Sequence, residues 1–138
     1  MILLIFDKTA DGNQLISIAR LIDAIFMLRP AAILYEWTVQ PGLEGNGTNV
    51  HGFELSLDDQ ERALPIDINK LIGWLGAGEC LVNAEFACPL LSIKIGIRDT
   101  TYLFAKSEAF QFLSLLSASF KNSTILRDDD VCFARSDS

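Results

Sequence analysis

The chain has 138 residues, half of them hydrophobic, and a net charge of −7. This length suits one domain with one hydrophobic core, and the charge argues against a nucleic-acid backbone as partner, because phosphates attract clustered lysine and arginine side chains. No segment approaches the ~20 apolar residues that span a bilayer, and the N-terminal apolar run is too short for an export signal. We therefore expect a single domain over residues 1–138, frayed at 136–138, with no membrane contact and a cytoplasmic location.

Negative charge is concentrated in the middle of the chain. No lysine or arginine occurs between Arg29 and Arg62, or between Lys70 and Lys94. A surface built from these two segments is anionic, which affects the choice of partner rather than the fold. The carboxylates of the two segments are Glu36, Glu44, Glu54, Asp58, Asp59, Glu61, Glu79 and Glu85.

The first half of the chain predicts a helix between strands. Ile2 to Phe6 is a continuous apolar run, typical of a strand that is buried on both faces inside a sheet. Apolar residues recur at helical spacing over 14–28, and Pro30 ends that helix. Apolar and polar residues alternate over 33–40 and again over 53–57, which predicts two half-buried strands. If the first two strands are parallel, the helix between them forms a right-handed crossover.

The second half predicts two more helices and further strands. Asp67 precedes a short helix that ends at Gly76. The segments 80–88, 91–98 and 101–105 alternate as strands, and a helix follows over 107–119. Short edge strands are predicted at 124–126 and 131–134, around an acidic turn at 128–130. This order predicts the α+β class, with about three helices on one face of a mainly antiparallel sheet of five to six strands.

With the helices on one face, the alternation sends Glu36, Glu54 and Glu85 to the other face of the sheet. One interpretation is an ordinary solvated sheet surface. The other is a platform that attracts a basic protein partner through its charge. Acidic loop residues would extend that platform: Glu44, Asp58, Asp59 and Glu61.

Three further features concern packing. Trp37 is expected in the core, whereas Trp74 interrupts the apolar stripe of its helix and either covers a core edge or anchors a partner. The helix around Phe110–Phe120 is apolar on almost every side, which predicts either a homodimer contact or cover from the C-terminal segment. Cys80 and Cys88 share one strand face and are expected to be buried structural thiols.

Candidate chemistry is sparse. His51, the only histidine, lies near Glu54 in a glycine-rich segment, and no nucleophile motif accompanies it, so an exposed loop histidine is the simpler interpretation. The glycines of 42–52 lead into a predicted strand rather than a helix N-terminus, which argues against a phosphate-binding loop. We therefore assign no catalytic residue, no metal ligand and no cofactor.

The leading hypothesis is an inhibitor of immunity or antitoxin type, which masks a basic site on a partner protein, such as a toxin or nuclease, through its acidic surface. In general profile the chain resembles the bacterial immunity proteins, which are small, acidic, cytosolic and α+β, and the resemblance involves no specific motif. Two alternatives stay open: a small enzyme or ligand-binding domain with a pocket near His51 and Glu54, and a structural subunit that forms a homodimer. The expected partner-binding residues are Glu36, Glu44, Glu54, Asp58, Asp59, Glu61, Trp74 and Glu85.

Overall fold

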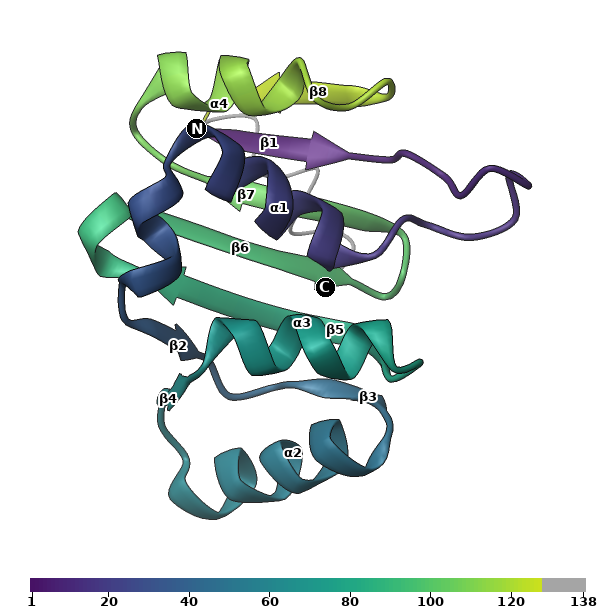
Figure 1. Ribbon diagram of the computed structural model, residues 1–138, viewed down its shortest axis with the longest axis vertical. Coiled ribbons are helices and arrows are strands. Elements are labelled where there is room, and N and C mark those ends of the chain that lie inside the picture. The colour runs from purple at the N-terminus through teal and green to yellow at the C-terminus, as the bar shows by residue number, and fades with distance from the viewer. Residues whose placement is uncertain (128–138) are drawn as a thin grey trace.

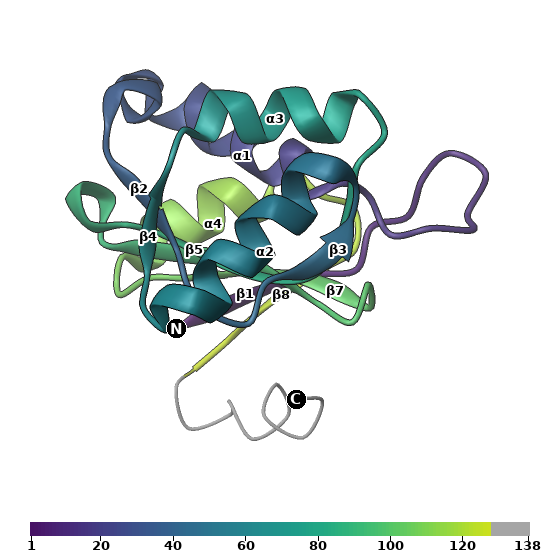
Figure 2. The ribbon, with the colours of Figure 1, turned by 90° about the horizontal axis from the view of Figure 1, so that it is seen from below.

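The computed structural model describes residues 1–127, which form one antiparallel sheet with helices packed mainly on one face (Figure 1, Figure 2). The class is α+β, as predicted, but residues 1–127 contain eight strands and four α-helices, more than the sequence predicts. The helices are α1 (Ile18–Leu28), α2 (Thr48–Gln60), α3 (Ile68–Gly76) and α4 (Phe110–Ser117), with short 3₁₀ helices η1 (Pro30–Leu34) and η2 (Pro89–Leu91). The strands are β1 (Ile2–Ile5), β2 (Trp37–Val39), β3 (Glu44–Asn46), β4 (Leu64–Ile66), β5 (Cys80–Cys88), β6 (Ile93–Arg98), β7 (Tyr102–Lys106) and β8 (Ser123–Leu126).

The strands follow the order β4-β2-β5-β6-β7-β1-β8, and β3 pairs with the first residues of β5. Each of these pairings is antiparallel. β1 lies between β7 and β8 and is buried on both faces, as its continuous apolar run predicts. β1 and β2 point in the same direction, but β5, β6 and β7 separate them, so α1 does not join neighbouring strands.

α1, α3 and α4 cover one face of the sheet and enclose the main core (Figure 2). Ser17 caps α1, because its hydroxyl accepts a hydrogen bond from the backbone N–H of Ala19 at 3.2 Å. Trp37 is 1% exposed, as predicted, and its Nε1–H donates to the Ala32 carbonyl at 3.1 Å. This bond ties η1 to the start of β2.

The predicted strand over 53–57 is wrong, because these residues lie in α2. Apolar residues at every second position of so short a window fit a strand, but two apolar residues four positions apart, such as Phe53 and Leu57, also fit one side of a helix. α2 buries Val50 and Leu57, seven residues apart on one helical face, and leaves Leu55 57% exposed. The helix packs beside β3 at one edge of the sheet, so Glu54 is not a sheet residue (Figure 1).

The predicted strand over 33–40 is wrong in its first half. Pro30 occupies the first position of η1, and only Trp37–Val39 are paired as strand β2. Proline presets the backbone angle that begins a helical turn. Glu36 therefore lies between η1 and β2 rather than on the sheet.

Cys80 is exposed, so the prediction of a buried thiol at this position is wrong. The register between β3 and β5 shifts at Glu44, which interrupts the alternation along β5, and Leu81 enters the core instead. Cys88 is buried as predicted, and burial raises the pKa of its thiol.

The C-terminal part of the described chain follows the prediction more closely. α4 is shorter than the predicted helix over 107–119, and β8 confirms the strand predicted at 124–126. Predictions for 128–138, namely the acidic turn, the strand at 131–134 and the frayed tail, lie outside the described residues, and a single domain over all 138 residues stays a prediction. The buried side chains of α4 are Phe112, Leu113 and Leu116.

Candidate functional site

The face of the sheet opposite α1, α3 and α4, which was predicted to be open and acidic, has a centre that is buried and apolar, with basic residues over it. Its buried cluster consists of Ile2, Leu4, Tyr102 and Phe104. The Arg98 guanidinium carbon and the Lys106 ammonium nitrogen lie 4.8 Å and 5.3 Å from the centre of the Phe104 ring. The predicted carboxylate platform is therefore wrong for the centre of this face.

Two of the predicted partner-binding carboxylates are separated from the others. Glu85 does lie on the sheet face opposite the helices. Its Oε1 is 3.3 Å from Nη2 of Arg98, so its charge is compensated within the chain. Glu36 is exposed at the start of β2. Neither residue belongs to β3 or α2, where the remaining carboxylates gather.

The remaining carboxylates follow β3 and α2, at the lower edge of the molecule in Figure 1. The helical period places Glu54 and Asp58 on the flank of α2 opposite Phe53, which faces α3. No lysine or arginine interrupts this part of the sequence. We call this surface the acidic edge and define it by Glu44, Glu54, Asp58, Asp59 and Glu61.

The C-terminus of α2 has an unfavourable local arrangement of charge. Asp58 and Asp59 lie in its last turn, where the helix dipole already presents negative potential, and each such charge costs about 0.3–1 kcal/mol at low ionic strength. Glu61 at the C-cap has φ of 55°, in the left-handed region that favours glycine. Within residues 1–127 none of these three carboxylates has an ion-pair partner. Local rules are broken in this way mainly at functional sites.

At the β3 end of the acidic edge, Asn83 links Glu44 to a further acid, Asp99. The Asn83 side-chain amide donates to Glu44 at 3.4 Å and to Asp99 at 3.1 Å, and the backbone N–H of Asp99 donates to the Asn83 oxygen at 2.9 Å. These bonds join β3, β5 and the β6–β7 turn. Asp99 lies in the turn between β6 and β7, and its approach to Glu44 depends on strand pairing, which the sequence does not reveal.

Trp74 lies in α3 and borders a groove of about 390 Å³ between α2 and α3. Its ring is half-buried and 6.1 Å from the Phe53 ring, centre to centre. Phe53 and Ser56 line the α2 side of this groove, and Lys70 lines the α3 side. Trp74 thus covers an edge of the core and also flanks the helix that carries the acidic edge.

His51 lies on the surface of α2 rather than in a loop, and its side chain is 64% exposed. Its Nδ1 is 3.3 Å from Oε2 of Glu54, one helical turn away. Neither residue lines the groove beside Trp74 or the cavity described below. Neither the groove nor the cavity is therefore the pocket that was expected near His51 and Glu54.

The glycine-rich segment leads into a helix N-terminus, contrary to the prediction of a strand. An anion already occupies that N-terminus: Oε1 of Glu79 accepts from the Val50 backbone N–H at 2.9 Å, and Oε2 accepts from the Asn49 side chain at 2.7 Å. These bonds, the Val50 bond first, lower the pKa of Glu79. Gly47 at the N-cap has φ of 128°, and a Cβ there would meet the Glu79 side chain closer than 3.0 Å. The chain's own carboxylate thus fills the place of a phosphate.

Glu79→Gln is expected to reduce stability at neutral pH and to weaken the pH dependence of unfolding in the acidic range. The folded-state pKa of Glu79 lies below the ordinary value of 4.5, so its contribution is present above that value and disappears as pH falls through the lower folded-state pKa. Urea unfolding of both proteins at neutral pH and well below 4.5 measures the effect. Glu36→Gln, at an exposed carboxylate, is the control. A stability difference that persists unchanged in acid would contradict this role.

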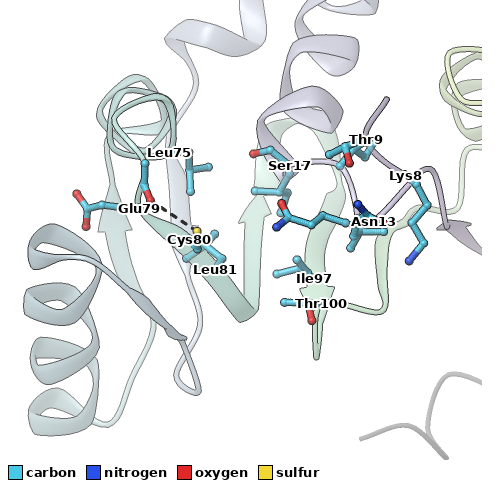
Figure 3. Close-up of a pocket in the computed structure, with 15 residues that line it drawn as sticks. Lys8, Thr9, Asn13, Ser17, Leu75, Glu79, Cys80, Leu81, Ile97 and Thr100 are labelled. Carbon is cyan, nitrogen blue, oxygen red and sulfur yellow. Dashed lines mark hydrogen bonds between the residues drawn. The ribbon is translucent and has the colours of Figure 1, made fainter. Parts of the chain in front are cut away.

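A cavity of about 510 Å³ lies between residues 8–18 and the start of β5 (Figure 3). The Cys80 sulfur points into it from one side, and Asn13 and Ser17 reach toward it from the other, whereas Glu79 turns away. Apolar wall residues include Leu81. The volume and the mixed lining suit a small amphipathic molecule. None of the described residues that line this cavity is a histidine, so Cys80 lacks the partner of a cysteine–histidine pair there.

In the part of the chain from 1 to 127, no three histidine, cysteine, aspartate or glutamate side chains are grouped so that they could hold a metal ion. No helix over the same residues combines the length and apolar character needed to cross a bilayer. The chain matches no protein-family model, and neither a curated protein nor a solved structure matches it. The surfaces and cavities described above are therefore the grounds for assigning a function.

Proposed function

We propose that this protein is an inhibitor of immunity or antitoxin type, which binds a basic protein partner through the acidic edge. The observation that carries the proposal is the group of carboxylates at the C-terminus of α2 that have no ion-pair partner among residues 1–127, where they oppose the helix dipole and Glu61 occupies a left-handed conformation. A cationic partner removes this local cost on binding. The same field also accelerates encounter with a basic protein at low salt.

The acidic edge also offers an apolar contact. Leu55 is 57% exposed on α2, and Asp58 and Asp59 follow it by three and four residues, on the adjoining turn of the helix. An exposed apolar side chain within a charged rim has the composition of a protein interface. Trp74 contributes from the groove on the other flank of α2, whereas Glu36 and Glu85 lie outside the proposed contact.

The inhibitor needs no cofactor, since masking a basic site requires only surface contact. We place it in the cytoplasm. Cys80 and Cys88 are free thiols, which the reducing conditions of that compartment preserve.

The test is a triple charge reversal, Asp58→Lys with Asp59→Lys and Glu61→Lys. The immobilised wild-type protein is expected to retain a stoichiometric basic partner from source lysate at low salt and to release it at high salt. For the purified partner, the triple reversal should raise the dissociation constant by tenfold or more. The same variant should be at least as stable as the wild type, because lysine at the C-terminus of α2 complements the helix dipole.

The matched control reverses three exposed carboxylates elsewhere, with Asp23→Lys, Glu36→Lys and Glu108→Lys. It changes the net charge equally and should leave the dissociation constant within about twofold at moderate salt. Equal weakening by both variants would show that net charge, not the acidic edge, attracts the partner. Recovery of no protein other than the chain itself would count against the proposal.

A second candidate function is a small ligand-binding domain, favoured by the cavity beside Cys80 rather than by His51 and Glu54. The same capture experiment separates the two functions. A domain that binds only a small molecule retains no stoichiometric protein partner, and its behaviour does not depend on the charge of the acidic edge.

A further inference from the structure

One end of the sheet gathers several connections. There β2 begins, β5 ends, β6 begins and β7 ends, as the strand registers require. η1 leads into β2, η2 joins β5 to β6, and α4 follows β7, so these elements share the end that lies on the left in both views (Figure 1, Figure 2). Arg29, directly after α1, lies over the Phe112 ring of α4 at 5.0 Å, which brings the C-terminus of α1 to the same end.

Large apolar side chains project from each of these segments. Met27 in α1 is 83% exposed, Leu34 in η1 is 86% exposed and Leu90 in η2 is 73% exposed. Ile33 and Phe110 are 43% and 55% exposed. We call these five residues the apolar end. Packing within the described chain leaves all five in contact with water.

We propose that the apolar end is a homodimer interface and that its occupant is a second copy of this chain. Five such side chains present on the order of 600 Å² of apolar surface, at the upper end of what the largest patch of a monomer exposes. A specific interface buries roughly 800 Å² on each partner. The apolar end therefore supplies most of the area that a stable dimer needs.

Charge favours a second copy over a strongly charged partner. The segments 27–36, 89–94 and 106–110, which carry all five side chains, contain three basic residues against two acidic ones, so these segments are nearly neutral within a chain of net charge −7. Two copies can meet here without the repulsion that contact between two acidic edges would cause. Homodimer interfaces are also the more apolar class, and two-fold dimers are the commonest soluble oligomers. The charged residues are Arg29, Lys94, Lys106, Glu36 and Glu108.

This contact differs from one along the whole segment Phe110–Phe120. Phe112, Leu113 and Leu116 pack within the chain, whereas Leu115 is 50% exposed, so the body of α4 offers one large apolar side chain rather than a continuous face. Phe110, at the first position of α4, lies at the apolar end. The proposed contact therefore lies at the end of the sheet, whereas the acidic edge lies along β3 and α2, at the lower edge of the molecule in Figure 1.

Sedimentation equilibrium of the full chain across the micromolar range tests the proposal. The wild type is expected to be a dimer, and Leu34→Asp with Leu90→Asp should raise the dimer dissociation constant by ~100-fold or more, because two carboxylates would be buried without partners. Both positions are largely exposed in the single chain, so the double variant should keep the circular dichroism spectrum of the wild type, and its melting temperature should match that of the wild type diluted below the dimer dissociation constant. Leu55→Asp, the same change at an exposed leucine of α2, is the control and should leave the dimer intact.

Any of three results would overturn the proposal, and the first two are a wild type that sediments as a monomer throughout and a dimer that survives in the double variant. Loss of the dimer in Leu55→Asp would also overturn it, because the interface would then involve α2. Sodium sulfate should strengthen an apolar dimer, whereas salt weakens the partner contact at the acidic edge. The two proposals can therefore fail independently.

Discussion

Trp37→Ala is expected to lower the free energy of unfolding by about 3–5 kcal/mol, the usual range for removing a buried tryptophan side chain. Trp37 is 1% exposed and begins β2, where it pairs with Ile66 of β4. Its loss would leave a cavity in the main core and leave the Ala32 carbonyl without the indole N–H. Equilibrium unfolding in urea, monitored by circular dichroism, measures the change.

Trp37→Phe separates the two causes. Phenylalanine keeps most of the apolar contact and removes only the donor, so a smaller loss of about 1–3 kcal/mol is expected. Because the indole bond holds η1, this variant should also loosen Ile33 and Leu34 and weaken the proposed dimer. A loss in Trp37→Ala below that of Trp37→Phe would contradict the assignment of Trp37 to the core.

Gly96→Ala is expected to destabilise the fold by roughly 2–4 kcal/mol through overpacking. Gly96 lies in β6 opposite Phe104, and the Phe104 ring occupies the space above it. A Cβ at this position would lie closer than 3.0 Å to the Phe104 ring and to the Ala84 carbonyl oxygen. The carbonyl belongs to the paired backbone of β5 and cannot move without distorting the sheet.

The control for this prediction is Gly73→Ala, at an interior position of α3 where nothing lies within 4 Å of the added carbon. Alanine there should stabilise the protein by up to about 1 kcal/mol, since it favours the helix over glycine. Urea unfolding of the two variants should therefore give changes of opposite sign. An unchanged free energy of unfolding for Gly96→Ala would mean that the Phe104 ring can move away from residue 96 and make room for the added Cβ.

Short alternating segments explain the main errors of sequence-based prediction. The apolar residues of 53–57 fit both a strand and a helix. The burial of Val50 and the packing of α2 against β3 show that this segment is a helix. Pro30 signals the end of α1, but the sequence did not show that residues 30–34 form a 3₁₀ helix, which backbone bonds from Ala32 to Arg29 and from Tyr35 to Ala32 define and the indole bond of Trp37 supports. Long, strongly periodic segments such as α1 and β5 were predicted as the right kind of element, although α1 begins at Ile18 rather than at residue 14, because Ser17 caps it and Leu15 pairs with Lys8.

The candidate site was predictable as a set of residues and not as a surface. The absence of lysine and arginine between Arg29 and Arg62 already identifies the carboxylates of the acidic edge. These carboxylates lie on one surface only because residues 48–60 form α2. Asp99 comes close to Glu44 only because β5 pairs with both β3 and β6. The apolar end was not predicted, since its members occupy four separate segments that meet only when the strands align.

The sequence alone determined the α+β class, the buried strand β1, the helix α1, the β6–β7 hairpin and the base-free segments, because each follows from local composition or periodicity. Only the tertiary structure decided that α2 is a helix, that Glu85 is paired with Arg98 and that Met27, Leu34 and Leu90 share an exposed end. Periodicity specifies which residues share a face of one element. Strand order and register, which depend on contacts distant in sequence, determine which faces meet and which stay open to a partner.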